Sequence, residues 1–167
     1  RPPAGGNKYD YRRWAMSVDG VSAAYVYPLR RGLGTVDVVI TSSGALPSAE
    51  TIATTQAYID DVRSVTAKNS LVLAPTYKAN DWHIQLKLSG ITLSEATSLV
   101  NSALDDYYSN LTPGETLVRS QVEGLITNIS GVTDRTVIAP SSNVVPAVDA
   151  TKVEWCRKGT VTVELMA

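Results

Sequence analysis

The side chains that could carry out acid–base or nucleophilic chemistry are few and widely spaced in this sequence. The single histidine, His83, lies in a stretch of alternating apolar and polar residues, which places it on the polar face of a predicted strand over residues 77–88. General base catalysis also needs a nucleophile and a group that orients the base, and no spacing around His83 supplies them. We therefore interpret His83 as a solvated surface residue.

Two pairs of neighbouring acids are the other candidates for proton transfer. Asp60 and Asp61 fall in one predicted helix, and Asp105 and Asp106 fall in another. Adjacent residues of a helix do not face each other, so neither pair directs two carboxylates at one substrate. Both pairs are interpreted as the solvated surfaces of helices.

The sequence also lacks the residues for a disulfide or a zinc site. Its one cysteine, Cys156, cannot form an internal disulfide, and one cysteine with one histidine cannot make the usual ligand set of a structural zinc. Beside Trp155 in a predicted strand, Cys156 is typical of a small buried apolar residue. The glycines Gly32 and Gly34 precede a strand and not a helix, which argues against a phosphate-binding loop. We predict no enzymatic activity, no cofactor, no metal and no small-molecule substrate.

The net charge of −1 conceals an uneven distribution. Residues 1–31 carry six basic and two acidic side chains, whereas residues 32–167 carry nine basic and fourteen acidic ones. The basic cluster is too small and too close to acids to predict nucleic-acid binding, but a protein partner needs only local complementarity. No stretch approaches the roughly 18 consecutive apolar residues of a membrane-spanning helix, so we expect a soluble protein with no membrane insertion.

Two stretches 111 residues apart repeat one pattern: a helix with an apolar face, then Gly-Val and a strand, and later a Gly-Thr-Val-x-Val strand. Gly20 and Gly131 follow the two helices, where a residue with positive φ is favoured. Both later strands alternate apolar with polar residues, as half-buried strands do. The apolar face consists of Tyr11, Trp14, Ala15 and Val18 in the first copy and of Val122, Leu125, Ile126 and Ile129 in the second. We predict that the copies superpose, with Trp14 and Leu125 at equivalent core positions.

The predicted elements do not alternate strictly between strand and helix. We expect helices over residues 8–18, 48–65 and 116–130 and a helix that begins at the capping box Thr92–Glu95, with strands over 21–27, 34–41, 71–74, 77–88, 132–139 and 159–163. This order predicts an α+β fold with mostly antiparallel sheets and packed helices. We expect a linker over residues 1–7, a first α+β lobe over 8–75 and a second over 76–167.

The order of short motifs along the chain resembles that of a known family. The motifs are Gly5-Gly6-Asn7, Asp10 to Ala15, Val18-Asp19-Gly20-Val21, Val26-Tyr27-Pro28, Gly32 to Val36, Ala74-Pro75-Thr76, Pro113-Gly114, Gly131-Val132, Pro140 and Gly159-Thr160-Val161. Each motif alone is weak, but together they resemble the baseplate J-like family, the wedge proteins of Mu-like contractile-tailed phage baseplates. Members are longer than this chain, which begins without a methionine, so we expect it to be a C-terminal part.

The resemblance implies a structural subunit of the baseplate wedge, made in the host cytoplasm and located in the virion tail. It implies assembly with copies of itself and with other wedge subunits around the central hub, without enzymatic activity. Two alternatives come from other classes of protein. A binding adaptor would hold a peptide or small ligand at an exposed sheet edge or at the loop 141–151, and a hydrolase would lose its activity when His83 is changed.

Five residues are candidates for a protein interface. Arg30 and Arg31 lie at the predicted tip of a hairpin, near Leu33, and Val144 and Val145 are apolar residues in an otherwise polar loop. Because no folding requirement for two adjacent cations is evident, we expect reversal of both arginines to glutamate to leave the melting temperature nearly unchanged and to weaken assembly.

Overall fold

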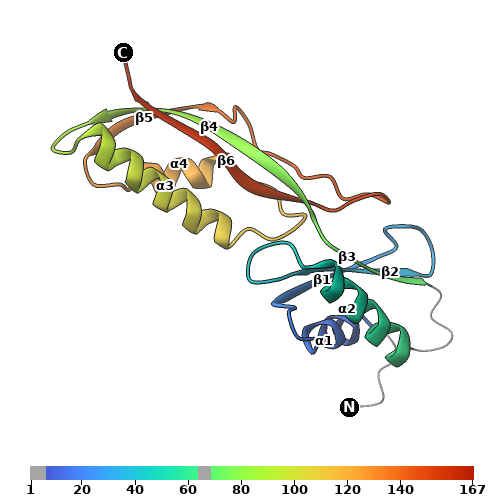
Figure 1. The fold of residues 1–167 in the computed structure, drawn as a ribbon. Coiled ribbons are helices and arrows are strands. Elements are labelled where there is room, and N and C mark those ends of the chain that lie inside the picture. The colour runs from blue at the N-terminus through green and yellow to red at the C-terminus, as the bar shows by residue number, and fades with distance from the viewer. Residues whose placement is uncertain (1–6, 64–68) are drawn as a thin grey trace. The chain divides into compact units, whose positions relative to one another are not determined.

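The computed structural model describes residues 7–63 and 69–167, and the chain divides into two compact units (Figure 1). The first unit comprises Arg1–Thr76 with Ala147–Val153, and the second comprises Tyr77–Pro146 with Glu154–Ala167. The units are therefore not contiguous in sequence, whereas the sequence predicts one lobe over all of residues 76–167. The predicted linker up to residue 6 and the predicted end of a helix at residues 64 and 65 lie outside the described residues.

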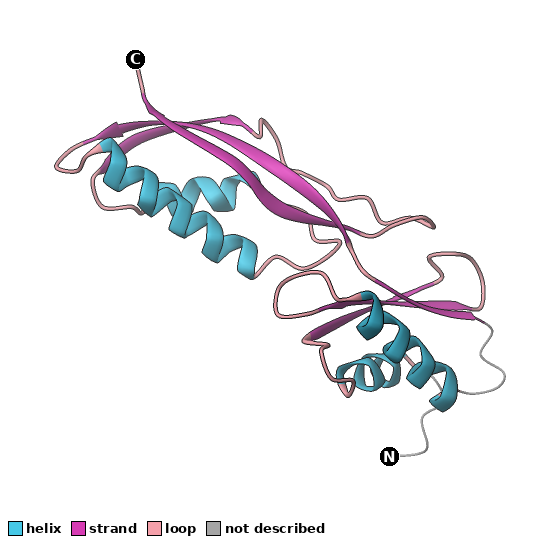
Figure 2. Cartoon of the chain, in the orientation of Figure 1, coloured by secondary structure: helices cyan, strands magenta, loops and turns pink. Residues whose placement is uncertain are grey.

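In the first unit, two helices lie on one face of a three-stranded sheet (Figure 2). The strand order is β1-β2-β3, with β1 antiparallel to β2 and β3 parallel to β2. The parallel pairing arises because the helix α2 lies between β2 and β3 in the sequence and carries the chain back across the sheet. The elements are α1 (Lys8–Met16), β1 (Ala23–Pro28), β2 (Thr35–Thr41), α2 (Ala49–Val62) and β3 (Asn69–Leu73).

Local sequence signals account for the helices of the first unit. The side chain of Asn7 accepts a hydrogen bond from the backbone of Asp10, and that of Ser48 accepts one from Thr51, so each N-cap satisfies a free amide of the first turn. On α2, the Gln56 side chain accepts a hydrogen bond from Val72 N at 2.7 Å, which joins the helix to the edge strand β3. The buried core comprises Tyr11, Trp14, Ala15, Val21, Ala24, Val26, Val38, Ile40, Ile59 and Val72.

The second unit also places two helices on one face of a three-stranded sheet, with strand order β5-β4-β6 (Figure 1). β4 pairs antiparallel with β5. Its contacts with β6 follow the same order along both strands, from Asp81 with Thr160 to Leu86 with Met166, so these two strands run parallel. The elements are β4 (Thr76–Leu88), α3 (Leu93–Ser109), α4 (Arg119–Thr127), β5 (Val132–Ala139) and β6 (Glu154–Leu165).

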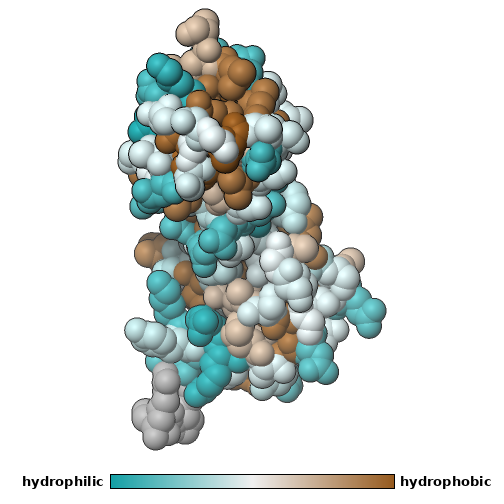
Figure 3. Space-filling view, turned by 90° about the vertical axis from the view of Figure 1, so that its left-hand side faces the viewer, coloured by the Kyte–Doolittle hydropathy of each residue, from teal (hydrophilic) through white to brown (hydrophobic). Residues whose placement is uncertain are grey.

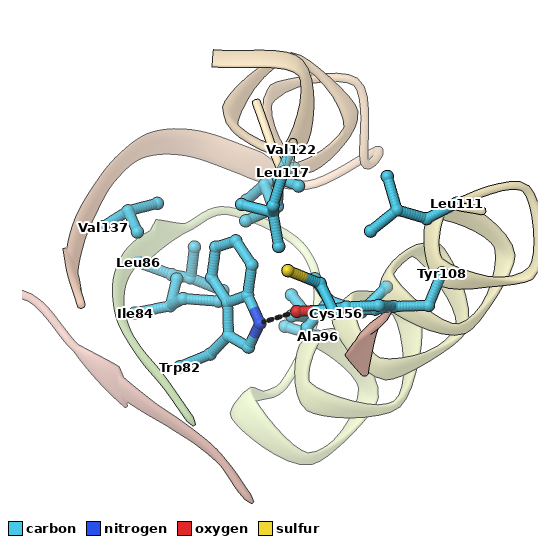
Figure 4. Close-up of a cluster of buried hydrophobic side chains, with 13 residues drawn as sticks. Trp82, Ile84, Leu86, Ala96, Tyr108, Leu111, Leu117, Val122, Val137 and Cys156 are labelled. Atoms are coloured by element: carbon cyan, nitrogen blue, oxygen red, sulfur yellow. Dashed lines mark hydrogen bonds between the residues drawn. The ribbon is translucent and has the colours of Figure 1, made fainter. Parts of the chain in front are cut away.

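The core of the second unit is built around Trp82 on the middle strand (Figure 4). Its indole Nε1 donates to the Tyr108 hydroxyl at 2.9 Å, and that hydroxyl donates to Asn80 Oδ1 at 2.8 Å. Burial raises the pKa of Tyr108 well above its ordinary value, so the phenol stays protonated and can donate. Cys156 is buried in the same cluster, as predicted, and burial raises the pKa of its thiol. Polar groups inside this core are thus paired with each other.

The duplicated pattern is preserved in the helices but not in the strand pairing. Gly20 and Gly131 both have positive φ, +93° and +98°. The strands β1 and β2 of the first copy pair with each other, whereas β4 lies between β5 and β6. The predicted equivalence of Trp14 and Leu125 is wrong, because Trp14 is 7% exposed and Leu125 is 39% exposed. The remaining positions of the apolar stripe are buried or half-buried in both copies.

The predicted α+β fold with two lobes is confirmed, and each sheet is mixed, with one antiparallel and one parallel pairing. Parallel pairing is therefore commoner than the mostly antiparallel pairing predicted from the order of the elements. The capping box of Thr92 and Glu95 at the start of α3 is also confirmed. Across the described residues, none of the helices is both long enough and apolar enough to span a membrane.

Candidate functional site: protein-interaction surfaces

The predicted hairpin tip between β1 and β2 is a tightly bonded loop. Leu29 N donates to Thr35 O at 3.0 Å, and Gly32 N donates to Leu29 O at 3.0 Å. Gly32 and Gly34 have positive φ, +117° and +76°, which glycine adopts without steric cost. Leu29 also has a positive φ, +66°, which is uncommon for a residue with a side chain. The loop is therefore held in one conformation by its own backbone.

The two arginines of this loop neutralise a buried acid. Arg30 Nε lies 2.8 Å from Asp37 Oδ2, and Arg31 Nη2 lies 2.8 Å from Asp37 Oδ1. The side chain of Asp37 is fully buried, and that of Arg30 is only 3% exposed. The hydrogen bonding of the Arg31 side chain to Asp37 raises the pKa of Arg31. The premise that no folding requirement calls for two cations here is wrong, because a buried carboxylate without a partner is strongly unfavourable.

Arg30 also joins the hairpin loop to Ala147–Val153, the segment of the first unit that separates the two parts of the second unit in the sequence. Its Nη1 donates to the carbonyl of Asp149, in a turn closed by a bridge between Val148 and Val153. In that turn Asp149 Oδ1 accepts hydrogen bonds from Thr151 Oγ1 and from two backbone amides, and these bonds, led by that of Thr151, lower the pKa of Asp149. The arginine thus fixes the relation between two loops of the first unit.

The apolar candidates differ in their surroundings. Leu33, in the hairpin loop, is 89% exposed. Val144 exchanges two backbone hydrogen bonds with Leu117 and is half-buried against the core of the second unit, so its apolar side chain has a folding role. Val145 beside it is 71% exposed. Leu33 and Val145 remain the members of the predicted interface that are open to a partner, and they belong to different units.

The candidates for chemistry are not assembled into a catalytic group. His83 Nε2 lies 2.6 Å from Glu164 Oε1, and Gln85 Nε2 donates to the same oxygen at 2.9 Å. Both His83 and Glu164 are more than one-third exposed, and within the described part of the chain these contacts include no hydroxyl or thiol nucleophile. The bonds from Gln85 first and His83 second lower the pKa of Glu164.

The paired acids lie on helix surfaces, as the sequence predicts. Asp60 and Asp61 are exposed on α2, and Asp105 and Asp106 are exposed on α3. Asp105 pairs with Lys158 Nζ at 2.6 Å. Over residues 7–63 and 69–167, no group of three or more His, Cys, Asp or Glu side chains is placed to hold a metal ion. These acids are therefore part of the exposed helix surfaces of the two units.

Two hollows of the second unit are not evident from the sequence. One lies between α3 and α4 and is lined by Asp106, Tyr107, Asn110, Leu111, Glu115, Gln121 and Leu125. The other, where the last residues of β6 meet the start of α3, is lined by Leu86, Lys87, Leu88, Ile91, Leu93, Leu165 and Met166. Figure 3 shows apolar side chains gathered on the upper part of the view, which is the second unit. Both hollows need residues from separate elements, so only the fold brings them together.

Two family models together match almost the whole chain. The Baseplate J-like central domain matches residues 3–74, and the Baseplate J-like protein C-terminal domain matches residues 81–164. The chain belongs to the baseplate J-like family. The resemblance inferred from the order of short motifs is thereby confirmed. Residues 147–153 fall within the part of the chain matched by the C-terminal domain, yet they pack with the first unit.

Relatives within the baseplate J-like family come from phages and prophages. The Mu-like prophage FluMu protein gp47 of Haemophilus influenzae is 34% identical over 155 residues, which cover 86% of this chain and 43% of the relative. The baseplate protein gp47 of Escherichia phage Mu is 27% identical over 170 residues, which cover 92% of this chain and 47% of the relative. The chain thus spans a little under half the length of these curated relatives.

A solved baseplate structure contains a chain with the same fold. In the six-fold symmetrised electron cryo-microscopy structure of the anti-feeding prophage baseplate, a chain matches with a TM-score of 0.66 and 12% identity. The match covers 90% of this chain and 37% of that chain. At this identity the likeness establishes a shared fold alone.

Proposed function

We propose that the protein to which this chain belongs is a structural subunit of the tail baseplate of a contractile tail, without enzymatic activity. The observation that carries the proposal is the match of two baseplate J-like domains, in order, to residues 3–74 and 81–164. Its relatives in phage Mu and in a Mu-like prophage support the same role. The tail is that of a phage, a prophage or a related injection system, and the protein is made in the host cytoplasm and incorporated into the virion tail.

The finer part of the proposal is a wedge subunit that contacts copies of itself and other wedge subunits around the central hub. A subunit of this kind needs several rigid contact faces rather than a reactive pocket. The two independent cores, with a loop fixed by Arg30 on the first unit and exposed helix faces on the second, supply such faces. Leu33 and Val145 are proposed contact residues on the two units.

The proposal is tested by deleting the gene from the phage or prophage that encodes this chain. We expect no complete contractile tails in the deletion strain and normal tails when a tagged copy is supplied, with the tag located at the baseplate by immunogold electron microscopy. A copy with His83→Ala should restore tails as well as the unchanged gene does, because no catalytic step depends on the imidazole. Normal tails in the deletion strain would contradict the structural role, and loss of tails with a folded His83→Ala protein would contradict the absence of catalysis.

A further inference from the structure

The exposed face of α1 combines cations with apolar side chains. Tyr9 is 75% exposed, and Arg12 and Met16 are exposed on the same helix. Spacings of three and four residues place these three side chains along one stripe. Lys8 adds further positive charge beside the stripe, whereas the charge of Arg13 is partly balanced by Asp10, whose Oδ1 lies 3.4 Å from Arg13 Nη2. The helix therefore presents a cationic surface with an aromatic and a thioether side chain in it.

The hollow between α3 and α4 has the opposite character. Asp106 and Glu115 are its charged lining residues, and Leu125 and Tyr107 supply apolar surface. The Tyr107 hydroxyl is fixed from inside the unit, because it donates to Gln121 Oε1 at 3.2 Å and accepts from Val118 N at 3.1 Å. The hollow is therefore a preformed acidic site with an apolar wall.

One charge on each of these two surfaces is not placed to stabilise its own helix. Lys8 lies in the first turn of α1 and Asp106 in the last turn of α3, where the helix dipole disfavours each charge. The neighbouring Asp105 differs from Asp106, because it is paired with Lys158 within the unit. A partner of opposite charge at each surface would account for both positions.

We propose that α1 of one copy docks its exposed face into the hollow between α3 and α4 of a second copy. Arg12 then faces Asp106 and Glu115, while Tyr9 and Met16 cover Leu125. Because two different surfaces meet, the contact is head-to-tail, and repetition of such a contact builds a ring or a chain of copies. The inference rests on the proposed function, since it assigns the surface through which copies of the structural subunit meet.

The 167-residue chain allows a charge-swap test by sedimentation velocity over a range of concentrations. We expect the unchanged chain to self-associate and either single reversal, Arg12→Glu or Asp106→Lys, to weaken association about tenfold. The double variant R12E/D106K should associate nearly as well as the unchanged chain. An equimolar mixture of the two single variants should also associate, because each unchanged surface meets an unchanged partner surface and the reversed charges meet each other.

Asp61→Lys on α2 is the matched control, because it makes the same charge change at an exposed helix position outside both surfaces, and it should leave association unchanged. Circular dichroism confirms that each variant is folded. A chain that stays monomeric at every concentration, or a charge-swapped pair that is not restored, would overturn the inference. Neither result bears on the deletion experiment, which tests the structural role separately.

Discussion

At the scale of single residues, the buried carboxylate of Asp37 explains an arginine pair that looks functional in the sequence. Residues 35–38 of the strand Thr35–Thr41 alternate in type, which predicts that Asp37 faces solvent, yet its side chain is fully buried. The signal that could have revealed this is a solitary acid in an apolar strand, six and seven residues after two adjacent arginines. Periodicity assigns a residue to a face, but it does not say what covers that face.

Replacing Asp37 with alanine should be strongly destabilising. The change leaves two guanidinium groups beside each other without the acid between them, so we expect the free energy of unfolding to fall by about 3 kcal/mol. Arg31→Ala should cost about 1 kcal/mol, because Arg30 still neutralises the carboxylate. Urea denaturation of the two variants measures both losses. Equal and small losses would mean that the three charges do not act as a unit.

The contact between Gln85, His83 and Glu164 predicts a pH dependence in acid. The pKa of Glu164 is lowered from its ordinary value of 4.5 in the folded chain, so the folded state favours the charged carboxylate. The corresponding stability is present above the unfolded pKa and is lost as the pH falls through the folded pKa. The melting temperatures of the unchanged chain and of Glu164→Gln should therefore converge below about pH 4.5. A constant difference down to pH 2 would contradict the shift.

At the scale of elements, helices were predictable and strand partners were not. Caps such as Asn7, Ser48 and Thr92 act within four residues, so the sequence alone locates the helix starts. The insertion of β4 between β5 and β6 depends on contacts across up to about 80 residues, which no local pattern encodes. The exposure of Leu125 could not be predicted from the sequence either, because it depends on which other elements pack over α4.

Two glycine substitutions test the packing of β4 against β6. A Cβ on Gly159 would contact Asp81 Oδ1 and lie 3.0 Å from Asn80 O, whereas a Cβ on Gly124, in the exposed surface of α4, would meet nothing within 4 Å. We expect Gly159→Ala to lower the free energy of unfolding by about 2 kcal/mol, since the strands must move apart. Gly124→Ala should raise it by about 0.5 kcal/mol through helix propensity. Thermal unfolding of the pair gives the two signs directly.

Adjacent valines in the loop before β6 provide a second matched pair. Val144 is half-buried against the core and bonded to Leu117, and Val145 faces solvent. Val144→Asp should cost about 2 kcal/mol, because a carboxylate would replace an apolar contact. Val145→Asp should change the free energy of unfolding by less than about 0.5 kcal/mol. If both cost the same, the loop is not docked as described.

At the scale of the whole molecule, two α+β units carry the two domains of the baseplate J-like family. The composition argues against a structural zinc site or an internal disulfide. The order of the short motifs indicates the family, because a series of motifs in a fixed order is far more specific than any single motif. The surfaces that contact partner proteins could not be predicted from the sequence. They depend on which side chains the fold leaves exposed, as Leu33 and the α3–α4 hollow illustrate.

Electron cryo-microscopy of tails purified from the organism that encodes this chain would show directly whether the protein is a structural baseplate subunit. If the protein is a structural baseplate subunit, the baseplate map should contain density that matches each of the two units, in the number of copies that the symmetry of the baseplate requires. A complete and well-resolved baseplate map without this density would contradict the structural role.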